Sequence, residues 1–398
     1  MAQKKNPHLK IVQPPQDLED IKKQTGKLRR EKIRKILIVA VLIILAVCGT
    51  YLLLKNQSYG QARTAAGYEN NTSDSNRYVH FAKGIVRYSR DGVVFLNKKN
   101  EEQWIQPVQL QNPIIDVCEE AFAVADSGGN SIFVFTEDGL KGEIETTLPI
   151  EKITVSDQGI VSAILKNESS PKIMSYDATG NILVEQQITM SSLGYPAALD
   201  LSDDGKMLAV SYLYTEGTSL KSRVIYYNFG EEGQEKTDNQ VTSDVYEDTV
   251  MAEIFFMGNS RSVAVSDHSF VIYKGKEVPE KEKEVEIRQE IRSVFHSDKY
   301  IGFILLNQDK SGYELRLYNR SGEQILNREI EGEYSNVKID GDEIILYDGS
   351  RCCIVTVTGI IKYQNDLDVE ILEIFRAAGL NRYYVMSTDE LRVIYLTK

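Results

Sequence analysis

The sequence is poor in cysteine and histidine, with four of each among 398 residues, and it has a single tryptophan. The four cysteines, Cys48, Cys118, Cys352 and Cys353, are too few for a disulfide framework in a domain of this size. Cys352 and Cys353 are neighbours, and neighbours on a strand point to opposite faces, so we do not expect them to pair. No Cys-x-x-Cys or Cys/His cluster is present, which argues against a zinc site.

Local catalytic motifs are also missing, including the Gly-x-Ser-x-Gly elbow, the phosphate loop and His-Glu-x-x-His. His80, His268 and His296 share no ligand spacing, and each is interpreted as a strand or turn residue rather than a catalytic base. Residues 307–312 resemble the start of a calcium loop, but Tyr318 stands where the last acidic ligand belongs, which favours a hairpin turn. We assign no catalytic, cofactor-binding or metal-binding residue and no cofactor.

Basic residues are scarce from residue 55 onward, where 35 Lys/Arg face 54 Asp/Glu, for a net charge of −19. Such a surface is a poor nucleic-acid binder, because phosphate contacts need basic side chains. The simplest interpretation is that negative charge keeps a large exposed domain soluble. Residues 1–35 have the opposite balance, with eleven Lys/Arg against four acids.

One long hydrophobic run is present, Ile36–Leu54, and it holds no charge and no proline. As a helix its nineteen residues would extend about 28 Å, close to the hydrocarbon thickness of a bilayer. Because basic residues flank the cytoplasmic end of a span, we expect a single-pass membrane protein with a cytoplasmic N-terminus and residues 55–398 outside the cell. The bilayer is therefore an expected partner.

Two alternatives for this run fit less well. A cleaved signal peptide would have an unusually long basic region, and no small-x-small site follows the run. Leu45–Cys48 resembles a lipoprotein box, but Val47 stands where a small residue is needed. The basic run Lys22–Lys35 is expected at the inner headgroups, with docking of a cytoplasmic partner as the alternative.

The sequence divides into four predicted parts. They are a basic cytoplasmic tail (1–35), a transmembrane signal-anchor helix (36–54), a flexible linker (55–77) and an extracytoplasmic domain (78–398). Residues 1–16 are expected to be flexible, and Asp17 is a plausible helix cap. The linker is assigned because residues 55–77 are mostly small and polar.

From Tyr78 onward the sequence has little helical pattern and many short strand-like runs rich in Val, Ile, Tyr and Phe. A repeating marker, an apolar run followed by a turn with Gly or Asn, occurs at Asn100, Gly139, Gly180, Gly233, Gly275, Gly322 and Gly359. A period near 40 residues with four strands per unit is typical of a β-propeller. The fold class is thus all-β, with a β-propeller preceded by one transmembrane helix.

Eight blades are favoured because three further strand-like runs follow the seventh marker; seven blades are the alternative, and paired sandwiches or tandem sheets are the rival architecture. We expect the strand near Tyr78–Phe81 to pair with the last blade, since ring closure removes edge strands. Lys276–Glu290 is interpreted as a loop and an edge strand.

Two resemblances add to this. The segment around Trp104 resembles one quinoprotein-like propeller repeat, in which a Trp docks between blades; other units lack that Trp, so no quinone is expected. Gly194–Lys206, AVSYLY and SRVIYYNFGEEGQ, with the basic tail, the single span and the final Ile-Tyr-Leu, look like an uncharacterised domain-of-unknown-function family of membrane-anchored, propeller-like proteins of Gram-positive anaerobes. The resemblance covers most of residues 30–398 and implies an envelope protein without a known activity.

The first functional hypothesis is a non-enzymatic scaffold that binds an envelope protein or wall polymer. The insertion around Tyr214–Leu220 and the loop Phe229–Tyr246 are candidate binding regions. The second is an enzyme that processes envelope glycan or peptide with carboxylates in the central channel. A third, signal transfer through the span, would require a cytoplasmic partner.

Overall fold

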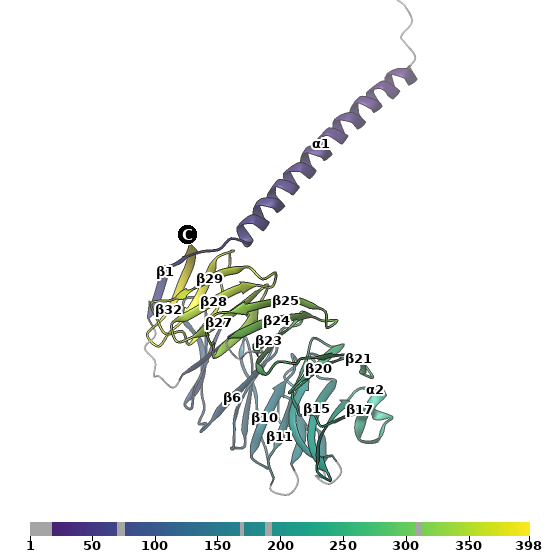
Figure 1. Cartoon of the computed structure of the whole chain (residues 1–398), viewed down its shortest axis with the longest axis vertical. Coiled ribbons are helices and arrows are strands. Elements are labelled where there is room, and N and C mark those ends of the chain that lie inside the picture. The colour runs from purple at the N-terminus through teal and green to yellow at the C-terminus, as the bar shows by residue number, and fades with distance from the viewer. Residues whose placement is uncertain (1–17, 70–75, 168–170, 188–192, 308–311) are drawn as a thin grey trace, which may run out of the picture. The chain divides into compact units, whose positions relative to one another are not determined.

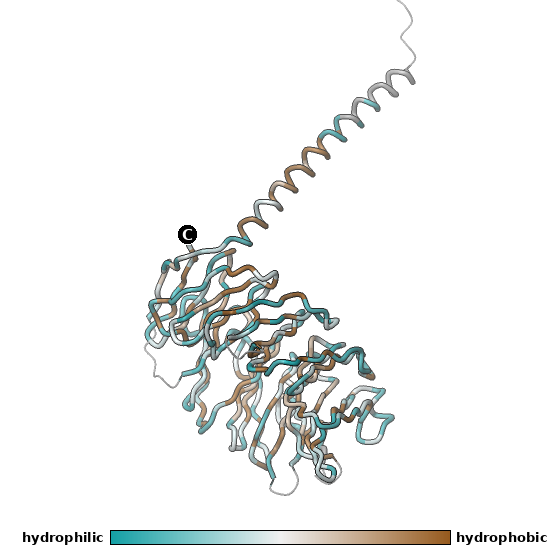
Figure 2. The backbone as a smooth tube through the Cα atoms, in the orientation of Figure 1, coloured by the Kyte–Doolittle hydropathy of each residue, from teal (hydrophilic) through white to brown (hydrophobic). Residues whose placement is uncertain are grey.

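The computed structural model describes residues 18–69, 76–167, 171–187, 193–307 and 312–398, and it divides into two units, Met1–Gln57 and Ser58–Lys398. In the first unit, residues 18–55 form one helix, α1 (Leu18–Lys55), which continues through Gly26 without a break (Figure 1). Its Lys32–Lys55 part is long and apolar enough to cross a membrane, and it is the hydrophobic stretch of the helix in Figure 2. The expected tail (1–16) and the cap at Asp17 lie outside the described residues.

The second unit contains eight sheets of four antiparallel strands, which we call blades 1 to 8. The strands of blades 1 to 4 are β2 (Arg77–Phe81), β3 (Gly84–Tyr88), β4 (Gly92–Leu96), β5 (Glu102–Pro107); β6 (Pro113–Val117), β7 (Phe122–Asp126), β8 (Ser131–Thr136), β9 (Gly139–Glu145); β10 (Ile150–Val155), β11 (Val161–Leu165), β12 (Lys172–Tyr176), β13 (Ile182–Gln187); β14 (Tyr195–Leu201), β15 (Met207–Glu216), β16 (Ser219–Asn228), β17 (Gln240–Glu247).

The strands of blades 5 to 8 are β18 (Met251–Phe256), β19 (Arg261–Ser266), β20 (Ser269–Lys274), β21 (Glu280–Glu286); β22 (Ile291–His296), β23 (Tyr300–Leu306), β24 (Tyr313–Asn319), β25 (Gln324–Ile330); β26 (Asn336–Asp340), β27 (Glu343–Asp348), β28 (Arg351–Thr356), β29 (Ile361–Asp366); β30 (Glu373–Arg376), β31 (Arg382–Met386), β32 (Glu390–Thr397) and β1 (Gln61–Glu69). Two short helices, α2 (Glu231–Gln234) and η1 (Thr237–Asn239), interrupt blade 4. The eight-bladed propeller is confirmed.

Ring closure differs from the prediction. The strand that completes blade 8 is β1, which pairs with β32 from Gln61↔Thr397 to Glu69↔Glu390. The prediction that Tyr78–Phe81 would close the ring is wrong, because that segment belongs to β2 and pairs with β3 inside blade 1. The predicted linker 55–77 therefore contains a strand over residues 61–69.

The repeating marker is the turn between the third and fourth strands of blades 1 to 7. Asn100, Gly180, Gly322 and Gly359 have φ values between +62° and +90°, a conformation that glycine and asparagine adopt most readily. The charged segment after Lys276 forms β21, the outer strand of blade 5, as expected. Its alternating Lys and Glu side chains protect an exposed edge from pairing with other chains.

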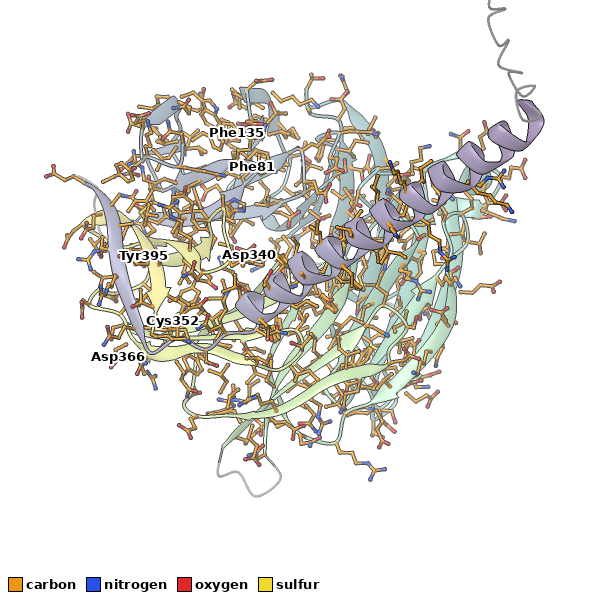
Figure 3. All side chains as sticks on the ribbon, turned by 90° about the horizontal axis from the view of Figure 1, so that it is seen from above. Phe81, Phe135, Asp340, Cys352, Asp366 and Tyr395 are labelled. Atoms are coloured by element: carbon orange, nitrogen blue, oxygen red, sulfur yellow. The ribbon has the colours of Figure 1, made fainter. Side chains whose placement is uncertain are left out.

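Buried apolar clusters fill the spaces between neighbouring blades, as sheet-on-sheet packing requires. The quinoprotein-like resemblance suggested that Trp104 docks between blades, and this is confirmed. The Trp104 ring, on β5, stacks on the Phe135 ring of blade 2, with their centroids 5.4 Å apart. Figure 3 shows the radial order within blade 7: Asp340 of β26 lies innermost, Cys352 of β28 lies farther out, and Asp366 of β29 lies at the rim. The first strand of each blade therefore lines the central channel.

Candidate functional site: the acidic mouth of the central channel

The central channel widens into a cavity of about 800 Å³. Blades 1 to 6 form its wall through their first strands, β2, β6, β10, β14, β18 and β22, and through the turns that follow these strands. Six carboxyl side chains line it, and no lysine or arginine is among its lining residues in the described chain: Asp116, Glu119, Asp200, Asp203, Glu253 and Asp298. The cavity is thus strongly acidic.

Two of these carboxyl groups hold neighbouring blades together. Asp116 on β6 accepts a hydrogen bond from the amide of Val155 on β10, at 2.7 Å. Asp200 on β14 accepts one from the Thr154 hydroxyl at 2.8 Å and another from the amide of Phe256 at 2.6 Å. Both side chains therefore have a structural role in linking the first strands.

The same kind of link occurs on the other side of the channel. Asp340 at the end of β26 accepts a hydrogen bond from the amide of Arg376 on β30, at 2.7 Å. A carboxylate on one inner strand that binds an amide of the next is thus a repeated device of this propeller. It satisfies main-chain donors that have no sheet partner on the channel side.

Glu119, Asp203 and Asp298 form a different group, which we call the rim acids. They lie in the turns after β6, β14 and β22, so three blades bring them to the same mouth of the channel. Glu119 and Asp298 are exposed and Asp203 is half-buried. No lysine or arginine side chain lies beside them in the cavity wall of the described chain. The rim acids are therefore available to a ligand.

The carboxyl groups affect one another. Burial, and then the negative charge of Asp116, raises the pKa of Asp200 to about 7. Burial likewise raises the pKa of Asp116 to about 6. The pKa of Asp203 is raised to about 6 by burial and by the charges of Asp298, Asp157 and other nearby acids. Repulsion among carboxylates is thus built into the site, and a bound cation would relieve it.

Aromatic rings complete the cavity wall. His296 stacks on Phe255 with their ring centroids 3.8 Å apart, and both residues line the cavity. Both His80 and His296 are open to the channel but closely surrounded by protein. Burial lowers the pKa of His80 and lowers that of His296 to about 4, so both imidazoles are neutral at neutral pH. The site combines carboxylates with flat ring faces, and both kinds of group attract cations.

Lysine and arginine side chains lie near the cavity, but none is part of its described wall. Lys276 lies 3.7 Å from the Asp204 carboxylate beside the rim, and the Arg320 guanidinium donates to the carbonyl oxygen of Met257. At the channel wall of blades 7 and 8, Lys338 is paired with Glu373. The negative charge of the mouth is therefore not matched by a lysine or arginine within the cavity wall.

The other residues singled out from the sequence lie elsewhere. His268 is in the turn between β19 and β20, where its Nδ1 lies 2.9 Å from the Asp267 carboxylate. Cys352 and Cys353 are free thiols, and they pack into two different buried clusters, in agreement with their opposite directions on β28. Residues 308–311 lie outside the described chain, but the flanking β23 and β24 pair as a hairpin.

The candidate binding regions in blade 4 do not reach the cavity. Tyr214–Leu220 extends the hairpin of β15 and β16, and the Arg223 guanidinium lies 5.0 Å from the centre of the Tyr214 ring. Gly194, in the segment that carried the family resemblance, has φ +93°, and a Cβ there would meet the Leu213 carbonyl oxygen at 2.4 Å. That glycine is therefore required by the backbone.

The cavity residues were not identified as a site from the sequence, although His80 and His296 were considered singly. Each of blades 1 to 6 contributes three or four of them from one short segment, and these segments recur at about the blade period, so the residues form no local motif. A usable signal was present, because a single Asp stands next to the end of otherwise apolar strands at Asp116 and Asp200. Within the described residues no group of three or more His, Cys, Asp or Glu side chains is arranged to hold a metal ion.

Comparisons with known proteins agree with the fold. BamB from Moraxella catarrhalis is similar in structure, with a TM-score of 0.53 and 11% identity over 84% of this chain and 100% of that chain. Saccharomyces cerevisiae Sqt1 has a TM-score of 0.54 and 12% identity, over 86% of this chain and 100% of that one. Likeness at such identity shows the fold alone. A comparison with curated protein sequences finds no match.

A family model described as "Family of unknown function (DUF5711)" matches residues 55–396. The match includes β1 and runs to within two residues of the end of the 398-residue chain, so it takes in the whole propeller. The chain belongs to the family of unknown function DUF5711.

Proposed function

We propose that this protein is a membrane-anchored, non-enzymatic binding module. In this proposal the propeller lies outside the cell, and the acidic mouth of its channel engages a positively charged segment of an envelope protein. The observation that carries the proposal is the cavity of about 800 Å³ with six carboxyl groups and no lysine or arginine in its described wall. Its volume is in the range of protein cavities that enclose a ligand.

The location outside the cell rests on the helix and its flanks. Lys32–Lys55 is apolar and long enough to cross a bilayer. Eleven Lys/Arg precede its uncharged run, Ile36–Leu54, and residues 55–398, with a net charge of −19, follow that run, which favours a cytoplasmic N-terminus. Only Asn56 and Gln57 separate α1 from Ser58, whose hydroxyl donates to the Ile361 carbonyl oxygen. The covalent chain alone would thus tether the propeller to the bilayer that α1 crosses.

The proposal of a cationic partner rests on a comparison between the rim acids and the acids elsewhere on the propeller. On the blade surfaces many acids are paired, as in Arg87–Glu102 and in Lys172–Glu185. The rim acids form no such pairs in the described chain, and burial together with the charges of nearby acids, Asp298 and Glu119 among them, raises the pKa of Asp203. A lysine or arginine side chain entering the mouth would supply the missing charge, and the exposed His296 ring, which stacks on Phe255, gives it a flat surface to pack against.

An envelope glycan- or peptide-processing enzyme is the second candidate. One observation favours it, because a carboxyl group with a pKa of about 7, such as that of Asp200, is typical of a general acid. Against it, the Asp200 oxygens are both hydrogen-bonded, to Thr154 and to Phe256, and Asp116 is bonded to Val155. Loss of hydrolysis of wall glycan in an Asp200→Asn variant that remains folded would support the enzyme instead.

The orientation is tested with tags at the two ends of the full chain. We expect a C-terminal tag to be reached by antibody on intact protoplasts and an N-terminal tag only after permeabilisation. The reverse pattern, or access to neither tag, would contradict a propeller outside the cell.

The binding surface is tested by photo-crosslinking in cells. A photoreactive amino acid replaces Ser297, which lines the cavity, or Thr388, in the turn between β31 and β32. We expect one protein adduct at position 297 that is absent at 388. The adduct should disappear in the triple variant Glu119→Gln, Asp203→Asn, Asp298→Asn, and persist in a control that neutralises three exposed acids, Glu143, Asp368 and Asp389. Equal adducts at both positions, or adducts only with wall glycan, would refute the proposal.

A further inference from the structure

The inner end of α1 carries five exposed basic side chains immediately before and within the start of the apolar stretch. They are Lys27, Arg30, Lys32, Arg34 and Lys35, which we call the basic collar. Glu31 is the single acidic residue between Lys22 and the end of the helix at Lys55. The collar therefore has a strong positive charge at one end of a membrane-length helix.

The collar is longer than a headgroup layer is thick, and its long side chains can bridge the difference. Lys27 and Lys35 are eight residues apart on an unbroken helix, which places their backbones about 12 Å apart along its axis. A bilayer's headgroup region is about 5–7 Å thick on each side, and long basic side chains add several ångströms of reach. All five cations can therefore reach headgroup phosphates at once.

The collar also surrounds much of the helix. At about 100° per residue, Lys27, Arg30 and Arg34 share one face, and Lys32 and Lys35 lie on a neighbouring face. Together they cover more than half of the circumference, so several lipids can be contacted together. A narrow stripe of charge, as used for a single partner helix, would cover less.

The two ends of α1 have opposite preferences for lipid charge. At the outer end the helix finishes with one base, Lys55, and continues into a domain of net charge −19 that repels anionic headgroups. Attraction of acidic lipid is therefore confined to the collar. Arginine binds phosphate through two parallel hydrogen bonds, and lysine acts as a point charge.

We propose that the basic collar is a binding site for the phosphate headgroups of acidic phospholipids in the inner leaflet. This inference rests on the membrane anchoring proposed above and is independent of what the propeller binds. It selects lipid rather than a cytoplasmic protein as the partner, because the charges cover more than half of the helix circumference next to the apolar stretch.

The test uses the purified full chain in phosphatidylcholine vesicles that contain a trace of spin-labelled phosphatidylglycerol or spin-labelled phosphatidylcholine. Electron spin resonance measures the fraction of each lipid that is immobilised at the protein. The collar variant replaces all five collar residues with Gln. The matched control replaces five exposed propeller lysines with Gln and so removes the same total charge. These lysines are Lys83, Lys98, Lys99, Lys206 and Lys299.

We expect the wild-type chain to prefer phosphatidylglycerol at least about threefold at low salt and to lose the preference at high salt. The collar variant should immobilise both lipids equally, and the control should keep the wild-type preference. If lipid is immobilised without any preference, or if the preference survives in the collar variant, the collar is not a site for acidic lipid, although the membrane anchoring still holds. No immobilised lipid of either kind would overturn the anchoring as well.

Discussion

The Lys362 ammonium donates a hydrogen bond to the Glu343 carboxylate in the interior, where blade 7 meets blade 8. Their side chains are 1% and 2% exposed, and Tyr383 of blade 8 donates to the same carboxylate at 2.7 Å. The Arg376 guanidinium lies 3.3 Å from it as well. The amide of Tyr59, just before β1, donates to the Lys362 carbonyl oxygen. This buried network therefore joins the closing blade to its neighbour.

Replacing Lys362 with Met is expected to destabilise the propeller by about 3 kcal/mol or more, because it leaves a buried carboxylate without its ammonium partner. The double variant with Glu343→Gln should recover part of that loss, since no charge then stays buried. Denaturant unfolding of the full chain in detergent measures both, with Lys99→Met as an exposed control. A single variant as stable as the control would contradict a structural role for the pair.

Trp104 is expected to hold blade 1 against blade 2. It stacks on Phe95 and Phe135, and its indole N–H donates to the Glu137 carbonyl oxygen at 3.0 Å. Trp104→Ala should cost about 3–5 kcal/mol of unfolding free energy. Trp104→Phe keeps an aromatic ring, loses the hydrogen bond and should cost about 1 kcal/mol from that loss. Calorimetry measures the unfolding free energy of both variants. Equal losses in the two variants would show that the aromatic ring itself contributes little.

The ionisation of Asp200 predicts a pH effect with a defined sign. Its pKa is raised to about 7 in the folded chain, above the value of an unfolded aspartate near 4. Between these values the folded state holds a proton that the unfolded state has lost, so stability falls as pH rises from about 4 to about 7 and is then level. Asp200→Asn does not titrate, and wild-type stability should decline relative to it over this range.

Melting temperatures of the two chains, measured from pH 4 to 8, test this. Asp389→Asn, at an exposed position, is the control and should show no such divergence. A constant difference between wild type and Asp200→Asn would show that the carboxyl group is already ionised when folded.

Removing β1 is expected to open the ring. A chain that begins at Ser58 keeps every strand of the propeller, whereas one that begins at Arg77 lacks the partner of β32. Without β1, β32 pairs only with β31 and becomes the exposed edge of a three-stranded blade, so we expect the shorter chain to melt at lower temperature and to associate. Light scattering and thermal unfolding of the two chains distinguish these outcomes. Equal behaviour would mean that β1 does not contribute to closure.

The blade repeat was predictable because most turns between third and fourth strands contain a Gly or Asn with positive φ, and these residues recur along the sequence. β1 was missed because Gln61–Glu69 contains no Val, Ile or Phe. Its strand state depends on β32, more than 300 residues away, rather than on local propensity. The channel mouth was missed for a related reason, since Glu119, Asp203 and Asp298 meet only when the ring is closed.

The measurement that most directly tests the channel mouth is equilibrium binding of a short Lys/Arg-rich peptide to the full chain, by calorimetry at low salt. We expect binding that weakens with salt, and at least about tenfold weaker binding to the variant Glu119→Gln, Asp203→Asn, Asp298→Asn. The control that neutralises Glu143, Asp368 and Asp389 should bind like wild type, and a Glu-rich peptide should not bind. Equal affinity of the peptide for both variants would show that the rim acids do not form a cation site.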